Sequence, residues 1–131
     1  MSEAIAPILE AILRKADQKL EAARRSLDAR DWDDAPSRAY YAAFHAVTAV
    51  LRQRGAVFTS QEQTLGAFNR DFVATGQFPK DTARVLTRLF KDRQLGDYEV
   101  LATLDAETAR EDVHDAGQLV RLCRDLVGRG G

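Results

Sequence analysis

The residues best suited to chemistry lie close together in one short segment, residues 93–98, which holds Arg93, Asp97 and Tyr98. An arginine guanidinium can bind a phosphate group through two parallel hydrogen bonds. A tyrosine can donate a hydrogen bond or stack on a base. It ordinarily titrates near pH 10, which makes it a poor general base at neutral pH. The segment therefore favours a binding role over acid–base catalysis.

A cationic stripe precedes this segment. Arg84, Arg88 and Lys91 follow one another at steps of four and three, so they share one face of a helix. Such a stripe can attract a phosphate backbone or an acidic partner. The alternative is an ordinary solvated helix face, which the pattern alone favours. We expect Arg84, Arg88 and Lys91 to be the phosphate-binding residues if a nucleotide or RNA is the ligand.

A second group of polar residues lies in an otherwise nearly charge-free stretch, residues 39–47 and its flanks. Arg38, Tyr41 and His45 line one side of the helix expected there. The ordinary interpretation of His45 is a core histidine with a satisfied partner. The functional interpretation places the three side chains around one polar groove with Arg93, Asp97 and Tyr98.

Composition limits the remaining possibilities. The chain has 131 residues, enough for one domain, and its net charge of −1 disfavours a globally basic nucleic-acid binder. The lone Cys123 excludes an internal disulfide and a multi-cysteine zinc site, and is expected to be a buried, inert thiol. With two histidines, His45 and His114, we expect neither a metal centre nor a cofactor. We expect a cytoplasmic protein without a membrane span, because no long apolar run is present.

Apolar residues at steps of three and four predict helices that position these groups. Gly96 is expected to interrupt the fourth helix. The expected fold is all-α, a single domain over residues 1–131 folded as a five-helix up-and-down bundle, with its core at about 5–127 and a flexible tail at 128–131. The expected helices span about 3–29, 34–53, 61–75, 80–95 and 105–127.

Two segments carry a resemblance to a known family. Residues 37–46, SRAYYAAFHA, strongly resemble the second helix of HEPN-domain proteins. Residues 93–98 resemble the Arg-x-x-x-Asp-Tyr signature of one branch of that family, and residues 69–76 are similar to the segment between the two. The resemblance covers roughly residues 5–127.

The resemblance implies a small helical bundle that usually forms a homodimer. Many family members pair with a minimal nucleotidyltransferase as toxin and antitoxin. Active members are metal-independent ribonucleases whose motif is arginine, four to six residues, then histidine, with two subunits lining one groove. Here Tyr98 stands where that histidine would be. Arg110 and His114 are too closely spaced for the motif and are interpreted as sharing a solvated face.

Two hypotheses follow from the resemblance, and the residues leave open whether the protein is an enzyme. The first is a HEPN-like binding module that engages a nucleotidyltransferase partner, a nucleotide or RNA through the Arg93 region. The alternative is a metal-independent RNA endonuclease with a non-standard site, using Arg93 with Tyr98 or with His45. A nucleotidyltransferase partner could also add nucleotides to Tyr98. The broad apolar face of residues 105–127 agrees with contact to a second subunit.

Overall fold

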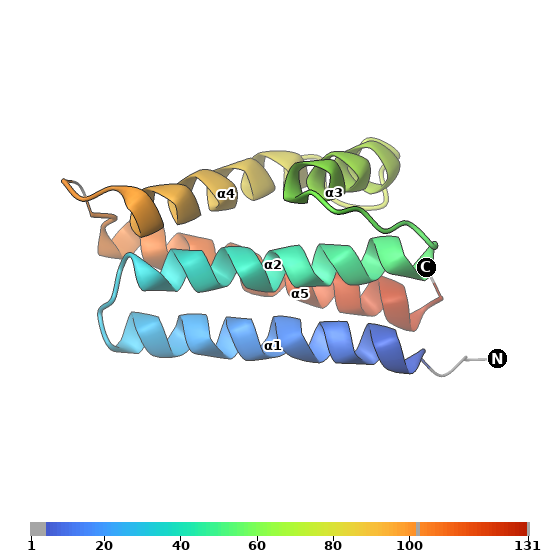
Figure 1. Ribbon diagram of the computed structural model, residues 1–131, viewed down its shortest axis with the longest axis horizontal. Coiled ribbons are helices and arrows are strands. Elements are labelled where there is room, and N and C mark those ends of the chain that lie inside the picture. Colours follow the sequence, from blue (N-terminus) through green and yellow to red (C-terminus); the bar gives the residue numbers. More distant parts are fainter. Residues whose placement is uncertain (1–4, 102, 131) are drawn as a thin grey trace.

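Long helices run back and forth along the molecule, with α2 in the middle (Figure 1). The computed structural model describes residues 5–101 and 103–130. These residues form helices, turns and loops, with no strand among them, so the all-α prediction is confirmed. The elements in chain order are α1 (Pro7–Asp28), α2 (Asp34–Gln53), α3 (Gln61–Phe68), the π-helical segment η1 (Asn69–Val73), α4 (Thr82–Tyr98) and α5 (Ala106–Gly128).

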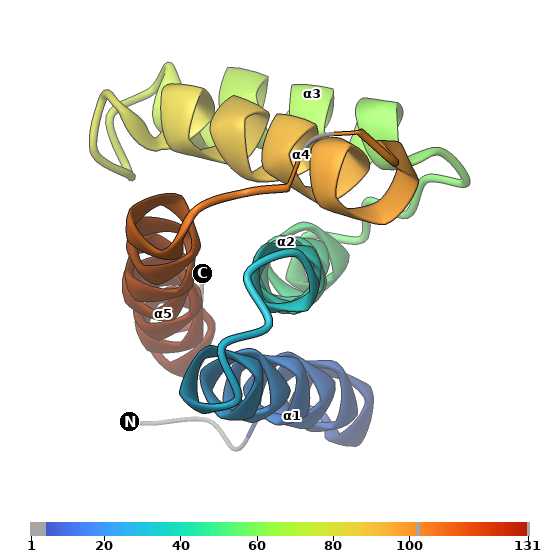
Figure 2. The same ribbon diagram turned by 90° about the vertical axis from the view of Figure 1, so that its left-hand side faces the viewer.

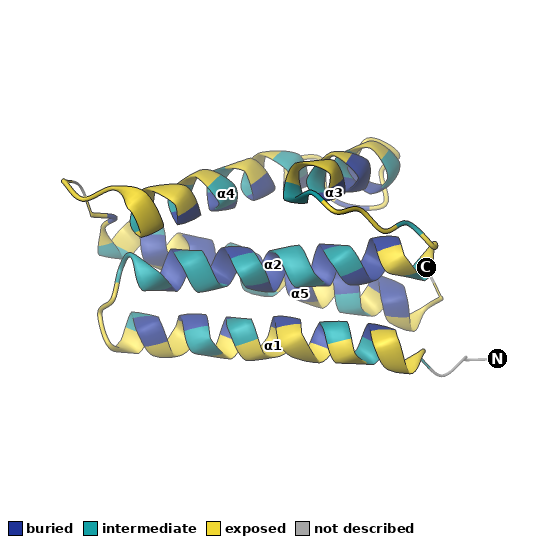
Figure 3. Ribbon diagram, in the orientation of Figure 1, coloured by how far each residue is buried: buried dark blue, intermediate teal, exposed yellow. Residues whose placement is uncertain are grey.

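Helix α2 is the centre of the bundle because it is apolar on nearly all sides. Viewed from the end of α2, α1 and α5 lie on two sides of it and α4 crosses over a third side (Figure 2). Coloured by burial, α2 is buried or intermediate along almost its whole length, whereas α1 has an exposed outer side (Figure 3). Small residues allow neighbouring backbones to approach closely. Six alanines of α2 are fully buried: Ala35, Ala39, Ala42, Ala43, Ala46 and Ala49.

Helix ends follow the capping residues of the sequence. Ser60 accepts a hydrogen bond from the backbone amide of Gln63 at the start of α3, at 3.1 Å. Asp105 accepts one from the amide of Thr108 at the start of α5, at 2.8 Å. The range expected for α2 agrees with the structure, and α5 extends to Gly128. The expected start of the first helix at residue 3 and the end of the expected tail, residue 131, lie outside the described residues.

Two expectations about helix boundaries are wrong. Gly96 does not interrupt the fourth helix, because α4 continues to Tyr98. A Cβ at Gly96 would lie 2.7 Å from the backbone oxygen of Asp33, so the glycine allows α4 to approach the α1–α2 turn closely. The helix expected over residues 61–75 is α-helical only to Phe68. It then widens into η1, where the amide of Ala74 donates to the carbonyl of Asn69 at 2.8 Å.

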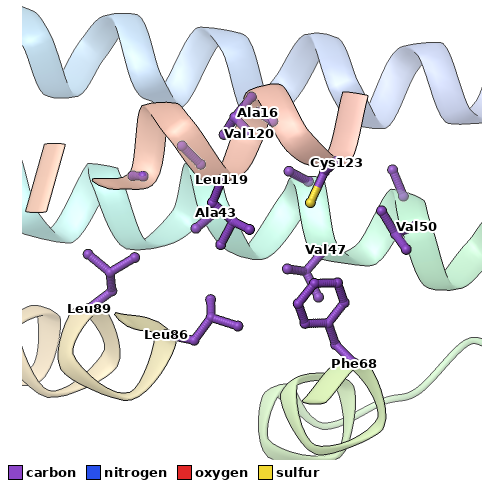
Figure 4. Close-up of a cluster of buried hydrophobic side chains, with 14 of the residues drawn as sticks. Ala16, Ala43, Val47, Val50, Phe68, Leu86, Leu89, Leu119, Val120 and Cys123 are labelled. Carbon is purple, nitrogen blue, oxygen red and sulfur yellow. The ribbon is translucent and has the colours of Figure 1, made fainter. Parts of the chain in front are cut away.

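The core is continuous across all five α-helices. Side chains of α1, α4 and α5, together with Phe68 of α3, pack around the side chains of α2 (Figure 4). Cys123 is fully buried in this cluster, and burial raises the pKa of its thiol. On the broad apolar face of α5, Leu119 and Leu126 are buried within the protomer, whereas Leu122 is exposed.

Candidate functional site

Arg93 lies near the end of α4 with its guanidinium among aromatic rings. The side chain is only 8% exposed. The guanidinium carbon is 5.2 Å from the ring centroids of Tyr40 and Phe90 and 5.5 Å from that of Tyr41. A cation over the face of a ring is attracted by the ring quadrupole, and more strongly when water is excluded. Helix α2 thus supplies two rings and α4 supplies one to hold this cation inside the protomer.

The charge of Arg93 has one carboxylate nearby. Arg93 Nη1 lies 3.9 Å from Asp97 Oδ2, one helical turn further along α4. The same carboxylate oxygen accepts a hydrogen bond from Ser37 Oγ of α2 at 3.3 Å. Arg93 Nε is buried and has no hydrogen-bond partner among the described residues. The group therefore joins α4 to α2, and little of the guanidinium is accessible to a ligand.

Of the aromatic partners of Arg93, Tyr41 was expected near it from the sequence, whereas Tyr40 and Phe90 were not identified as site residues. Tyr40 is fully buried, and its hydroxyl donates a 2.7 Å hydrogen bond to Gln61 Oε1 of α3. Burial raises the pKa of Tyr40 to about 12, although Arg93 opposes the increase. Phe90 stands one helical turn before Arg93. This spacing could have linked Phe90 to Arg93 from the sequence, because residues three apart share a helix face.

The end of α4 carries a projecting apolar surface, which we call the α4 apex and define as Leu95, Tyr98, Val100 and Leu101. Tyr98 is 72% exposed, Val100 89% and Leu101 95%. The chain leaves the bundle here as a corner beyond α4 (Figure 1). Neighbouring exposed apolar side chains are typical of surfaces that bind other proteins. Tyr98 therefore lies on the surface, unlike Arg93.

The polar residues of α2 that were expected to share a groove have different partners. Arg38 Nε donates to Asp34 Oδ2, which also accepts from Ser26 Oγ at 2.6 Å. Burial acts to raise the pKa of Asp34, but the hydrogen bonds from Ser26 and Arg38 outweigh it, so the pKa is lowered. Tyr41 is half-buried against Arg93. The structure thus brings Tyr41, Arg93 and Asp97 together, whereas Arg38 pairs within its own helix.

His45 is half-buried, and its charged neighbours are on α1. Burial lowers the pKa of His45, and Lys15 and Lys19 of α1 lower it further. The neutral imidazole is favoured at neutral pH as a result. Its ring lies at 6.1 Å from that of Phe44, and no contact with Arg93 is recorded among the described residues. His45 therefore lies apart from the Arg93 cluster, which consists of Arg93, Asp97 and the three rings around the guanidinium.

Arg88 differs from the other members of the cationic stripe. Its guanidinium joins α4 to α5 through three carboxylates, at 3.0 Å to Asp112, 2.5 Å to Asp115 and 3.3 Å to Glu111. Arg84 is exposed, with Asp81 at 3.7 Å, and Lys91 is exposed. The stripe thus presents Arg84 and Lys91 to solvent, while Arg88 is occupied within the protomer.

Asp112 is a buried acid that sequence reasoning missed. It is fully buried on α5, beside Asp92 of α4. Burial and the neighbouring Asp92 together raise the pKa of Asp112 to about 8, although Arg88 opposes both effects. One carboxylate oxygen of each acid has no other partner among the described residues, as expected for two acids that share a proton. The signal was present, because Asp112 follows Ala109 by three positions on the inward stripe of α5.

Arg110 of α5 packs on Trp32, which lies in the turn between α1 and α2. The Arg110 guanidinium carbon lies 5.5 Å from the ring centroid of Trp32, and Trp32 packs against the core. His114 is exposed on α5, the helix that also carries Arg110.

Among the helices described, none is long and apolar enough to cross a membrane.

Comparison with known proteins covers nearly the whole chain. Residues 9–126 match the family model of the HEPN domain. A UPF0332 protein of Thermotoga maritima is 34% identical over 120 residues, covering 92% of this chain and 91% of that protein. Two proteins of Methanocaldococcus jannaschii also match. "Putative toxin MJ0142" is 26% identical over 81% of this chain and 72% of its own length, and "Putative toxin MJ0605" is 28% identical over 79% and 74%.

Proposed function

The chain belongs to the HEPN domain family, and from this premise we propose that it is a toxin-type binding module that docks a minimal nucleotidyltransferase in the cytoplasm. The observation that carries the proposal is the α4 apex, where Tyr98, Val100 and Leu101 are exposed beside the immobilised Arg93 cluster. Two relatives named putative toxins support the toxin-type assignment. The protein acts as a homodimer in this proposal, and a nucleotide or RNA is the further ligand class.

The geometry supports binding more strongly than cleavage. A ribonuclease needs a cation at the reacting phosphate and a group that moves protons at neutral pH. The Arg93 guanidinium is enclosed by three rings, and a tyrosine stands at the histidine position of the motif. By contrast, the exposed apolar side chains of the apex are suited to a protein partner.

Tyr98 is the acceptor in this proposal if the partner modifies the protein. Its side chain is exposed at the end of α4, so a partner's active site can reach the hydroxyl. The tyrosine oxygen attacks the α-phosphorus of ATP, the bond to the pyrophosphate leaving group breaks, and the phenolic proton passes to a base of the partner. Intact mass after incubation with the partner and ATP tests this step. We expect a nucleotidyl mass gain that is lost in Tyr98→Phe; a gain retained in that variant contradicts it.

Docking is tested by changing the apex while leaving the fold intact. Leu101→Asp places a charge on a side chain that is 95% exposed, so it leaves the core unchanged. We expect it to abolish co-purification with a nucleotidyltransferase encoded beside this chain. Val57→Asp is the matched control, because Val57 is also largely exposed but lies in the loop before α3. Equal co-purification of the Leu101→Asp variant and the control contradicts docking through the apex.

The alternative function is a metal-independent RNA endonuclease. The observation in its favour is the lowered pKa of His45, since a neutral imidazole can act as a base. Labelled RNA incubated with the protein in a chelator distinguishes the two functions. Cleavage that is lost in His45→Ala or Tyr98→Phe supports the enzyme. Binding without cleavage, weakened in Arg84→Gln and Lys91→Gln, supports the module with RNA as its ligand.

A further inference from the structure

A pocket outside the site described above lies between α1 and α5. The two helices run side by side over part of their length (Figure 2). The pocket has a volume of about 260 Å³. Its lining consists of Arg24 of α1 and of Val113, His114, Gly117, Gln118 and Arg121 of α5.

Gly117 lies in the lining of this pocket, next to Arg24 of α1. A Cβ at that position would lie 3.5 Å from Arg24 Nη2 and 3.8 Å from a methyl carbon of Leu20. These are ordinary contact distances, so the Arg24 guanidinium lies against the backbone of α5 at Gly117. His114 and Arg121 stand one turn before and one turn after Gly117, on the same face of α5. The pocket lining therefore has Gly117 between two nitrogen-bearing side chains of α5, with Arg24 of α1 nearby.

The lining is one-sided in charge. It holds two arginines and a histidine and no carboxylate, in a chain whose net charge is −1. Arg24 has Glu21 at 4.0 Å, and both side chains are more than half exposed, so that pair is weak. No ion pair is recorded for Arg121 among the described residues.

The next arginine along α5 shows the contrast. Arg124 contacts two carboxylates of α1, Asp17 at 2.5 Å and Glu10 at 3.7 Å. The α1–α5 surface therefore neutralises Arg124, while Arg24 and Arg121 converge on one pocket without equivalent partners. Like charges that converge in this way repel one another unless an anion lies between them.

We propose that this pocket binds the phosphoryl group of a small phosphomonoester. The guanidinium groups of Arg24 and Arg121 provide paired donors that match phosphate oxygens. The Gln118 amide and a His114 ring nitrogen can donate further hydrogen bonds. The volume accommodates a phosphoryl group with a small attached group, but is below that of most pockets for drug-sized ligands. This site does not depend on the α4 apex or on the function proposed for it.

Amide NMR of the full chain tests the proposal with inorganic phosphate and glycerol 3-phosphate as probes, against sodium chloride at matched ionic strength. We expect saturable shifts of the Gly117 amide with both probes. Arg121→Gln removes one charge-assisted contact and should weaken binding about tenfold. Arg14→Gln is the control, because Arg14 is an exposed arginine of α1 that does not line the pocket.

Three results would overturn the proposal. The first is a chloride response that equals the phosphate response. The second is equal affinity in Arg121→Gln and Arg14→Gln. The third is competition by a short RNA without terminal phosphates at the same strength as glycerol 3-phosphate, which would assign the pocket to the nucleic-acid backbone.

Discussion

Replacing Asp112 by asparagine should make the protein more stable at neutral pH, although it removes one of the carboxyl groups that contact Arg88. Asp112 is fully buried beside Asp92, and Arg88 donates to its Oδ1 at 3.0 Å. An asparagine carbonyl oxygen can accept the same hydrogen bond from Arg88. Its amide can donate to Asp92 in place of the shared proton. The variant thus keeps the local hydrogen bonds without a second carboxyl group that must stay protonated.

The sign and size of this change in stability follow from the difference in the pKa of Asp112 between the folded and unfolded states. Burial, and then Asp92, raise the pKa of Asp112 in the folded protein to about 8, from an ordinary value of 3.8 in the unfolded chain. The folded state therefore holds a proton that the unfolded state releases between these values. The free energy of unfolding falls as pH rises through this window, by up to about 1.4 kcal/mol per pH unit for one group. Asp112→Asn removes this contribution.

Urea unfolding of both proteins from pH 5 to pH 7 measures the effect. The stability of the variant relative to the wild type should increase by up to about 2.7 kcal/mol over this range. This corresponds to a relative gain of roughly 10 °C in Tm. Other titrating groups, such as His45, cancel in the difference between the two proteins.

Asp115→Asn is the matched control for this experiment. Asp115 also accepts from Arg88, but it is not fully buried. Its loss should lower stability at pH 7, because Arg88 loses a partner. A stability difference between Asp112→Asn and the wild type that stays constant from pH 5 to pH 7 contradicts the buried shared proton.

Four other outcomes can be measured directly. Gly96→Ala should destabilise the protein by about 1–3 kcal/mol in urea unfolding, because its Cβ would meet a backbone oxygen; Gly66→Ala, in open space on α3, should instead stabilise it by roughly 0.5–1 kcal/mol. Tyr40→Phe should cost about 1 kcal/mol, since Gln61 loses its 2.7 Å hydrogen bond, and an unchanged denaturation midpoint would contradict this role. Cys123 should resist a thiol reagent in the native protein and react after unfolding; rapid native labelling would show that it is accessible.

Local sequence signals predicted most of the fold. Apolar residues at steps of three and four predicted the helices, and Ser60 and Asp105 cap the helices that follow them in the structure. Gly96 was misinterpreted because a glycine in a helix signals either an end or a close approach. Only the position of the α1–α2 turn, distant in sequence, distinguishes the two.

The candidate site was less predictable because its partners come from different helices. The sequence grouped Arg93 with Tyr41 of α2, but it did not indicate that Tyr40 also lies against the guanidinium. Arg88 has the same spacing as Arg84 and Lys91, and only the docking of α5 makes it a structural residue. The buried carboxyl group of Asp112 could have been suspected from its place on an apolar stripe. Its pairing with Asp92 required the tertiary structure.

The position of the only tryptophan gives this protein an internal optical probe. Trp32 lies in the α1–α2 turn, with Arg110 over its ring, and the adjacent Asp33 touches α4 at Gly96. Indole emission therefore originates from one end of the bundle, where α4 also ends. Intrinsic fluorescence can follow events there in real time, without a dye or an added label.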